Sequence, residues 1–291
     1  MKKIRFAVIL VLLFLVGCGN NGDEDVFEIA VIPSQSIGEM QEGLTKLEET
    51  LAQELDREVT VEPYPNYNAV VEAINYNHID LAYLGPVTYV LAHEQSGAQA
   101  IITQLIDGEP FYHSYIVTHA DAQWEDLDEL LEDRADIDFA FGSMSSTSGS
   151  IIPSVELYER GVFQSPDEHD FGTLTYTGSH DITAESVQNK QVDAGAIDSA
   201  IFDALVEEGT IDGDQFNIIW ESEKLYQYPW VVPGEMDEET ITAIQNAFVD
   251  ITDTEILSIF GGASGFITTS DEEYQAVAEA VEVARGIGLL E

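Results

Sequence analysis

The chain has 291 residues, of which 45% are hydrophobic, so it is long enough and apolar enough to fold into two lobes with their own cores. It carries 55 acidic residues against 10 basic ones, which gives a formal net charge of −45 at pH 7. Such a charge disfavours nucleic acid or an anionic membrane surface as a partner. It is typical of an acidic surface in a saline or alkaline habitat, where salt screens the repulsion between like charges.

The first 25 residues have the pattern of a targeting segment followed by a tether. Three basic residues precede an apolar run at 6–16, which Gly17 and Cys18 follow. This order predicts a lipoprotein signal peptide over 1–17, a lipid on Cys18 and a flexible polar tether over 18–25. A transmembrane span is the alternative, but the apolar run is short for crossing a bilayer. Because Cys18 is the only cysteine, an intrachain disulfide is excluded, and we expect an extracytoplasmic protein anchored to the cell membrane by its lipid.

After the tether, strand and helix patterns alternate along the chain. Short apolar runs recur, and the stretches between them have apolar residues at helical spacing. The strands are expected at 27–32, 59–63, 81–84, 100–105 and 112–119, and the helices at 39–55, 67–76 and 87–94. A strand-helix-strand-helix order predicts a mostly parallel sheet with helices on both faces.

A second unit of the same kind follows, after which the chain returns to the first. Between about 120 and 220, strands are expected at 137–141, 174–176, 194–197 and 216–220, and helices at 125–133, 151–158, 181–189 and 199–208. A strand at 230–232 and helices at 238–251 and 271–286 rejoin the first unit. We therefore predict an α/β fold with residues 26–118 plus 228–291 in lobe 1 and 119–227 in lobe 2. Since ligands of open α/β sheets bind beyond the carboxyl ends of the strands, we expect a cleft between the lobes that closes by a hinge.

The most distinctive stretch lies where the strand at 137–141 is followed by a helix. Gly142 ends the strand, and a segment rich in hydroxyl side chains follows, which we call the Ser/Thr loop: Ser145, Ser146, Thr147, Ser148 and Ser150. One hydroxyl would suffice as a helix cap, which is the simpler interpretation. Five hydroxyls beside the unpaired N–H groups of a helix start instead indicate an oxyanion site built without lysine or arginine. Pro153 disfavours one unbroken helix from Ser146, so we expect a late start or a kink.

Further polar or aromatic residues fall at other strand-to-helix transitions. They are Tyr67, Tyr112, His180 and Asp198. Each has a structural alternative, since a tyrosine at a helix start is commonly packed in the core, while His180-Asp181 and Asp198 could serve as helix caps. Their common position on one predicted rim favours a joint binding role.

Several segments resemble the substrate-binding proteins of ABC importers for phosphonate, phosphite and phosphate, the PhnD-like family with the type II periplasmic-binding-protein fold. They are 66–73, 79–89, 112–114, 145–153, 178–181, 192–199 and 265–266. The resemblance covers nearly all of the chain after the tether, and its most specific parts are the Ser/Thr loop and Leu84-Gly85-Pro86. It implies that each lobe has a mixed, mostly parallel sheet flanked by helices. It also implies a monomer without a cofactor that delivers its ligand to an ABC transporter permease.

The same resemblance implies roles for the candidate residues. The Ser/Thr loop, from Ser145 to Ser148, would hold the oxygens of a phosphorus oxyanion, and Tyr67, Tyr112 and His180 would add hydrogen-bond donors. Asp198 would face a group of the ligand that carries a proton. Family members that take aminoalkyl phosphonates have a further acid where this chain has Gln227 or Tyr228, which favours a smaller oxyanion here.

Three other kinds of protein remain as alternatives. A hydrolase could use a serine with His180, but the chain lacks a Gly-x-Ser-x-Gly elbow, and Asp181 is adjacent to His180 in sequence and poorly placed to orient it. A metal-binding receptor is disfavoured because the six histidines are scattered. A binding protein that works with a separate sensor is the third alternative.

Overall fold

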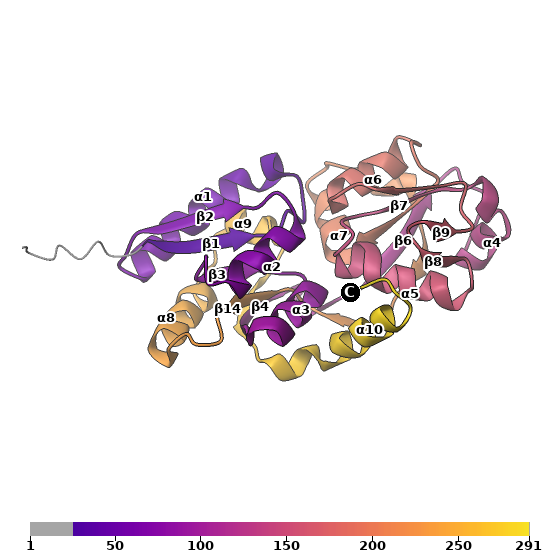
Figure 1. Ribbon diagram of the computed structural model, residues 1–291. Coiled ribbons are helices and arrows are strands. Elements are labelled where there is room, and N and C mark those ends of the chain that lie inside the picture. Colours follow the sequence, from indigo (N-terminus) through magenta and orange to yellow (C-terminus); the bar gives the residue numbers. More distant parts are fainter. Residues whose placement is uncertain (1–25, 291) are drawn as a thin grey trace, which may run out of the picture.

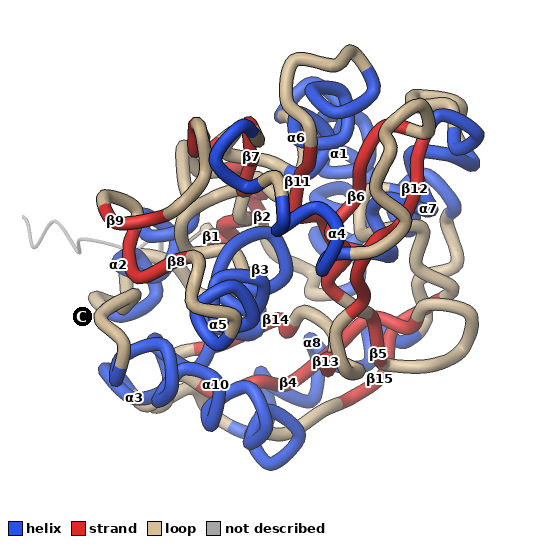
Figure 2. Tube along the Cα trace, turned by 90° about the vertical axis from the view of Figure 1, so that its right-hand side faces the viewer, coloured by secondary structure: helices blue, strands red, loops and turns tan. Residues whose placement is uncertain are grey.

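The structure is a computed structural model that describes residues 26–290, and these residues form two lobes side by side (Figure 1). The predicted signal peptide at 1–17 and the whole predicted tether at 18–25, with the lipidation site Cys18, lie outside the described residues. A six-stranded sheet lies at the centre of lobe 1 and a five-stranded sheet at the centre of lobe 2. Figure 2 looks at the molecule from the side of lobe 2 and shows helices packed around the strands of both sheets.

The sheet of lobe 1 is mixed, as the family resemblance implied. Its strands lie in the order β15-β4-β14-β3-β1-β2. They are β1 (Phe27–Val31), β2 (Val59–Pro63), β3 (Leu81–Tyr83), β4 (Gln99–Leu105), β14 (Pro229–Val232) and β15 (Gly265–Thr268). β1 runs parallel to β2 and β3, whereas β14 and β15 pair with their neighbours in the antiparallel direction. The alternating strand and helix pattern of residues 27–96 therefore forms the parallel half of this sheet.

The helices of lobe 1 cover this sheet with their apolar faces. They are α1 (Ile37–Glu54), α2 (Tyr67–Asn75), α3 (Pro86–Ser96), α8 (Glu238–Val249), α9 (Thr254–Ser258) and α10 (Gln275–Gly286), with a 3-10 turn at Asp271–Tyr274 before α10. On α1 the buried stripe consists of Met40, Gly43, Leu44, Leu47 and Leu51. A Cβ on Gly43 would come within 2.5 Å of the Glu255 carbonyl oxygen, so glycine allows α1 and α9 to pack closely.

Lobe 2 has the strand order β10-β7-β11-β6-β12. Its strands are β6 (Ser114–His119), β7 (Asp138–Phe141), β10 (Thr173–Tyr176), β11 (Ala194–Asp198) and β12 (Phe216–Glu221), and a small hairpin is formed by β8 (Phe163–Ser165) and β9 (Glu168–His169). Its helices are α4 (Leu127–Glu132), α5 (Ile152–Glu159), α6 (His180–Gln188) and α7 (Ser199–Glu207), with 3-10 turns at Arg134–Asp136 and Gly213–Gln215. The sequence patterns did not predict the hairpin, α9 or β15.

The chain passes between the lobes twice, and the two passages pair with each other. The strand expected at 112–119 is in fact two strands, β5 (Phe111–Tyr112) and β6, interrupted at His113. β5 pairs with β13 (Leu225–Tyr226) on the return passage, while β6 pairs with β11 and β12 in the sheet of lobe 2. The boundary expected after residue 118 therefore falls too late for the sheets, since the chain enters lobe 2 at about residue 113.

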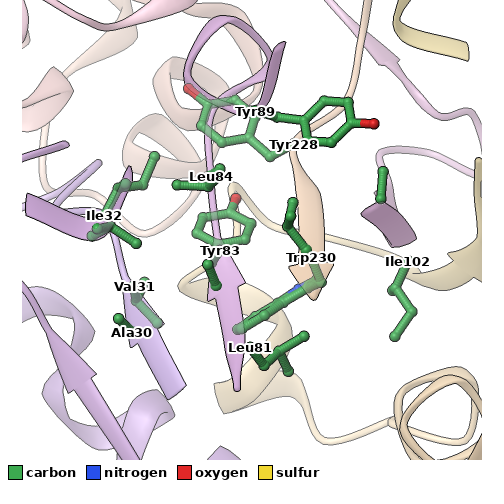
Figure 3. Close-up of a cluster of buried hydrophobic side chains, with 14 of the residues drawn as sticks. Ala30, Val31, Ile32, Leu81, Tyr83, Leu84, Tyr89, Ile102, Tyr228 and Trp230 are labelled. Atoms are coloured by element: carbon green, nitrogen blue, oxygen red, sulfur yellow. The ribbon is translucent and has the colours of Figure 1, made fainter. Parts of the chain in front are cut away.

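The core of lobe 1 contains an aromatic cluster that includes Tyr228, which follows β13 on the return passage between the lobes. Tyr83 and Trp230 are paired residues on β3 and β14, and Figure 3 shows them packed together, with Tyr228 nearby. The rings of Tyr83 and Tyr228 stack with centroids 5.5 Å apart. The Tyr83 hydroxyl donates to Gln104 Oε1 at 3.0 Å, so this buried hydroxyl is satisfied within the lobe. Stacking thus fixes Tyr228 at the edge of a rigid core.

Candidate oxyanion site between the lobes

Seven of the eight candidate site residues are buried together where the lobes meet. Tyr67, Tyr112, Ser146, Thr147, Ser148, His180 and Asp198 each expose 2% or less of their surface. Tyr67 begins α2 and His180 begins α6, while Asp198 ends β11 and caps α7. All three therefore lie at carboxyl ends of strands, which is where the ligands of open α/β sheets bind.

Ser145 is placed differently from the rest of the Ser/Thr loop. It is only half-buried, and its hydroxyl donates to Asn68 Oδ1 of lobe 1 at 2.7 Å. Together with Asn68 it lines an open groove at the rim of the interface. The structure thus supports a bridging contact between the lobes for Ser145, outside the buried cluster.

The Ser/Thr loop forms a wide helical turn before α5 begins. Residues Thr147–Ile151 adopt a π-helical turn, and Pro153 then lies in the first turn of α5, so the late start expected from this proline is present. Ser146 caps the turn, since its Oγ accepts from the backbone N–H of Gly149 at 3.1 Å. One hydroxyl is thus a cap, as the simpler interpretation required, and the hydroxyls of Thr147 and Ser148 serve other purposes.

The hydroxyl of Thr147 lies between the lobes. Its Oγ1 accepts from the backbone N–H of Val87, in the first turn of α3, at 2.8 Å. The hydroxyl hydrogen of Thr147 thus stays available to donate to a ligand. The neighbouring Ser148 Oγ lies 3.5 Å from Asp198 Oδ2.

The tautomer of His180 follows from one hydrogen bond. Its Nδ1 lies 3.2 Å from the backbone N–H of Asp198, which can only donate, so Nδ1 is the acceptor and Nε2 carries the hydrogen. Burial lowers the pKa of His180 to about 4, with a smaller opposing effect from Asp181. His180 is therefore a neutral donor at neutral pH, and its Nε2 lies 3.4 Å from both Ser146 Oγ and Tyr228 Oη.

Gly149 makes this position of the His180 ring possible. A Cβ at residue 149 would come within 2.9 Å of His180 Cε1 and of Ser146 Oγ. Any larger residue would displace the ring or the capping hydroxyl, so the glycine in the Ser/Thr loop is a packing requirement of the site.

Asp198 is the only acid in the buried cluster. Its Oδ1 accepts from the backbone N–H groups of Ala200 at 2.8 Å and Ile201 at 3.1 Å, so the expected capping role is real. Burial nevertheless raises the pKa of Asp198 to about 7, because these bonds and the hydroxyls of Tyr228 and Ser148 only partly offset the loss of solvent. Near neutral pH the carboxyl group is therefore partly ionised: it accepts a hydrogen bond when ionised and can donate one when protonated.

Two tyrosine hydroxyls in the cluster have no hydrogen-bond partner. They belong to Tyr67, which faces Ser146, and to Tyr112, which faces Thr147 and Ser148, in both cases without the geometry of a hydrogen bond. Burial raises the pKa of both tyrosines, so they are neutral donors. Because buried polar atoms are rarely left unpaired, these hydroxyls indicate a site for a ligand that supplies acceptors.

Tyr228 belongs to the same cluster, although the sequence pointed only to Gln227 or Tyr228 without choosing between them. Its ring lies against Tyr112, with centroids 5.5 Å apart, and its hydroxyl lies 3.4 Å from His180 Nε2. Gln227 is also fully buried, with its side-chain amide nitrogen unpaired. A clue in the sequence was that Tyr228 directly precedes a strand on the passage between the lobes.

Within residues 26–290, the basic side chains have charged or aromatic neighbours away from this cluster. Lys46, Arg134, Arg160, Lys190, Lys224 and Arg285 form ion pairs, and Arg57 lies over the ring of Phe27. The cluster therefore offers hydroxyl, imidazole and backbone donors in place of basic side chains. Over the same described range no group of three or more His, Cys, Asp or Glu could hold a metal ion.

The arrangement does not form a hydrolase triad. A triad histidine donates from Nδ1 to a carboxylate, whereas Nδ1 of His180 accepts from a backbone amide. The carboxylate of Asp181 is instead occupied by the Ser36 N–H and the Ser179 hydroxyl.

The fold and the site together define a two-lobed solute-binding protein. The family model for the periplasmic substrate-binding protein of ABC phosphonate transporters matches residues 29–274. The chain is 24% identical to the phosphate-import protein PhnD of Mycolicibacterium smegmatis, over 97% of this chain and 95% of that protein. It is 26% identical to the probable ABC transporter phosphite-binding protein PhnD1 of Prochlorococcus marinus, over 87% of this chain and 88% of that protein.

A solved structure of PhnD1 from Prochlorococcus marinus in complex with methylphosphonate superposes with a TM-score of 0.78, at 23% identity, over 91% of this chain and 99% of that one. The chain therefore belongs to the family of periplasmic substrate-binding proteins of ABC phosphonate transporters, and it has their type II fold. Proteins of this family bind solutes and are not enzymes. Among residues 26–290 no helix is both long and apolar enough to cross a membrane.

Proposed function

We propose that this protein captures a small phosphorus oxyanion between its lobes and closes over it by a hinge. The observation that carries the proposal is the buried cluster of neutral donors around Asp198. The hydroxyls of Tyr67, Tyr112, Ser146, Thr147 and Ser148, together with His180 Nε2–H, are the donors that would surround the ligand oxygens. Ser145 would contribute from the rim by joining the lobes.

Asp198 would select for a ligand that carries a proton. An ionised carboxylate beside an anion is repulsive unless a hydrogen lies between them, and monohydrogen phosphate has one to donate. Because the pKa of Asp198 is raised to about 7, this one proton can reside either on the carboxylate of Asp198 or on the ligand. Sulfate has no proton to share at neutral pH, so the site would reject it most strongly when Asp198 is ionised.

The relatives support phosphate, phosphite or a simple phosphonate as the ligand. The two described above are named a phosphate-import protein and a probable phosphite-binding protein, and the structural neighbour holds methylphosphonate. Tyr228 and the neutral side chain of Gln227 occupy the region where an aminoalkyl chain would need an acid. This supports a smaller ligand.

The cellular setting is part of the same proposal. A lipid on Cys18 would hold the protein on the outer side of the cell membrane, the residues that follow would act as a tether, and the ligand would pass to an ABC transporter permease. We expect a monomer whose acidic surface suits a saline or alkaline medium. The lobes would be residues 26–113 plus 228–290 and residues 114–227, since β6 pairs in lobe 2.

Titration calorimetry of the protein without its lipid would test the proposal. The ligands would be phosphate, phosphite, methylphosphonate, 2-aminoethylphosphonate and sulfate in a buffer free of these anions. We expect tight binding of one of the first three and weak binding of the last two. Preferred binding of the aminoalkyl phosphonate or of sulfate would contradict it.

A further inference from the structure

A second set of contacts joins the lobes beside the proposed oxyanion site. The backbone N–H of His180, in lobe 2, donates to the Ser34 carbonyl of lobe 1 at 3.0 Å. The backbone N–H of Ser36, in lobe 1, donates to Asp181 Oδ2 of lobe 2 at 3.1 Å. Lobe 2 supplies the donor of the first bond and lobe 1 the donor of the second, and both bonds join the segment before α1 to the start of α6.

The position of Asp181 makes its hydrogen bond to Ser36 important for holding the two lobes together. Asp181 lies in the first turn of α6, and its carboxylate also receives the N–H of Ser36, the residue that precedes α1. The backbone N–H of Ser36, at the N-cap position of α1, thus finds its acceptor in a carboxylate from the other lobe. One buried charge thus lies at the N-terminal ends of two helices that belong to different lobes, where helix dipoles favour a negative charge.

These contacts also act on the ligand-binding histidine. The backbone N–H of His180 is held by lobe 1, while its ring Nδ1 is held by the Asp198 amide of lobe 2. Separating the lobes would break the first bond and leave the second. The orientation that aims Nε2 into the cluster is therefore supported from both lobes only when the protein is closed.

We propose that Asp181 is a positioning residue that latches the lobes shut over the bound ligand, through Ser36, without touching the ligand itself. The proposal rests on the proposed oxyanion-binding function. Because the latch exists only in the closed state, it stabilises that state, and a ligand that requires closure binds more tightly as a result. Its main effect falls on ligand release, since opening must break the latch first.

Three variants test the latch: Asp181→Ala, Ser36→Pro and the double variant. Ser36 has φ −57°, which proline adopts, so this change removes the N–H donor and leaves the backbone angle of residue 36 as it is; the proline ring also takes the space next to the Asp181 carboxylate, which breaks the same contact from the lobe 1 side. A hydrogen bond to a charged group supports an expected rise of about tenfold in the Kd and the dissociation rate of the tightest-binding anion among phosphate, phosphite and methylphosphonate. Since both changes remove one bond, the double variant should bind about as weakly as either single one.

A matched control separates the latch from simple loss of a helix cap. Asp237 caps α8 by accepting from Glu239 and Thr240, all within lobe 1, so Asp237→Ala should lower the melting temperature and leave the Kd and the dissociation rate unchanged. Equal Kd values for the unmodified protein and Asp181→Ala, or effects that simply add in the double variant, would overturn the latch.

Failure of the proposed function would look different. In that case the unmodified protein would bind none of the three anions, and the latch, which acts on a bound anion, would fail with the proposed function. A protein that binds one of them equally well with aspartate or alanine at position 181 would overturn the latch and leave the proposed function standing.

Discussion

Replacing Asp198 by asparagine should stabilise the ligand-free protein, and increasingly so as the pH rises from about 5 to about 8. Asparagine has nearly the same shape and keeps an oxygen that can cap α7 through Ala200 and Ile201. It cannot ionise, so it removes the unfavourable charge that Asp198 acquires in a buried site.

The size of the effect follows from the raised pKa. Folding raises the pKa of Asp198 from 3.8 to about 7, so the folded chain keeps a proton that the unfolded chain has lost. This contribution to stability is fully present below pH 3.8 and disappears as the pH rises through 7. Between pH 5 and pH 8 the unmodified protein should lose roughly 2–3 kcal/mol of stability from this group, at about 1.4 kcal/mol per pKa unit. The asparagine variant keeps that stability.

Differential scanning calorimetry at pH 5 and pH 8, in buffers free of phosphate and sulfate, measures the difference. The melting temperature of Asp198→Asn relative to the unmodified protein should be roughly 4–12 °C more favourable at pH 8 than at pH 5, given about 2–4 °C per kcal/mol for a chain of this order of size. His180, whose pKa is lowered to about 4, titrates in both proteins and cancels in the comparison.

An exposed helix cap provides the control. Asp237 caps α8, and the hydrogen bonds that its carboxylate accepts, the one from the N–H of Thr240 most of all, lower the pKa of Asp237. Asp237→Asn should therefore lower stability by a similar amount at pH 5 and pH 8, since Asp237 is ionised at both. A change in melting temperature for Asp198→Asn that is the same at the two pH values would refute the buried ionisation.

Four further outcomes concern binding. Thr147→Val should weaken binding of the preferred anion at least tenfold in calorimetry, because it removes a donor to a charged group, and it should also lower the melting temperature, because the buried N–H of Val87 loses its acceptor. Gly149→Ala should weaken binding at least as much, because the new Cβ displaces His180, and a thermal melt and crystal structure of the variant would check this. The ratio of phosphate to sulfate affinity should fall as the pH is lowered from about 8 to about 6, because protonated Asp198 can donate to sulfate, and asparagine at 198 should flatten this dependence. Small-angle scattering should show a smaller radius of gyration with saturating ligand, and an unchanged radius would contradict hinge closure.

Local patterns in the sequence were enough to predict most of the lobes. The repeated strand-helix order gave the parallel strands and their helices, and the hydroxyl-rich loop lies where it was expected, between β7 and α5. The patterns failed where long-range pairing decides the structure. A break at His113 is not visible in the alternation of residues 112–119, because it arises when β5 pairs with β13 and β6 pairs with β12.

The site shows the same division. Ser146, Thr147, Ser148, His180 and Asp198 were recognisable because each follows a strand in a pattern typical of a helix start. The contribution of Tyr228 depends on stacking against residues far away in sequence, and the cross-lobe bond of Asp181 depends on how the lobes meet. Ser145 belongs to the same loop as its neighbours, and only the tertiary structure separates it from the buried cluster.

The absence of basic side chains from the cluster, within residues 26–290, suits the composition of the chain. A buried lysine or arginine would attract every anion. Neutral hydroxyls and backbone N–H groups bind tightly only a ligand whose acceptor atoms lie in the directions of these donors. In the proposed complex, the ligand charge would be compensated by the helix N-terminal ends that meet here, from the Ser/Thr loop, α6 and α7, together with one proton shared with Asp198. Since that proton would reside on a group with a pKa of about 7, the proposed site would distinguish oxyanions by how many hydrogens they carry, a property that charge alone could not provide.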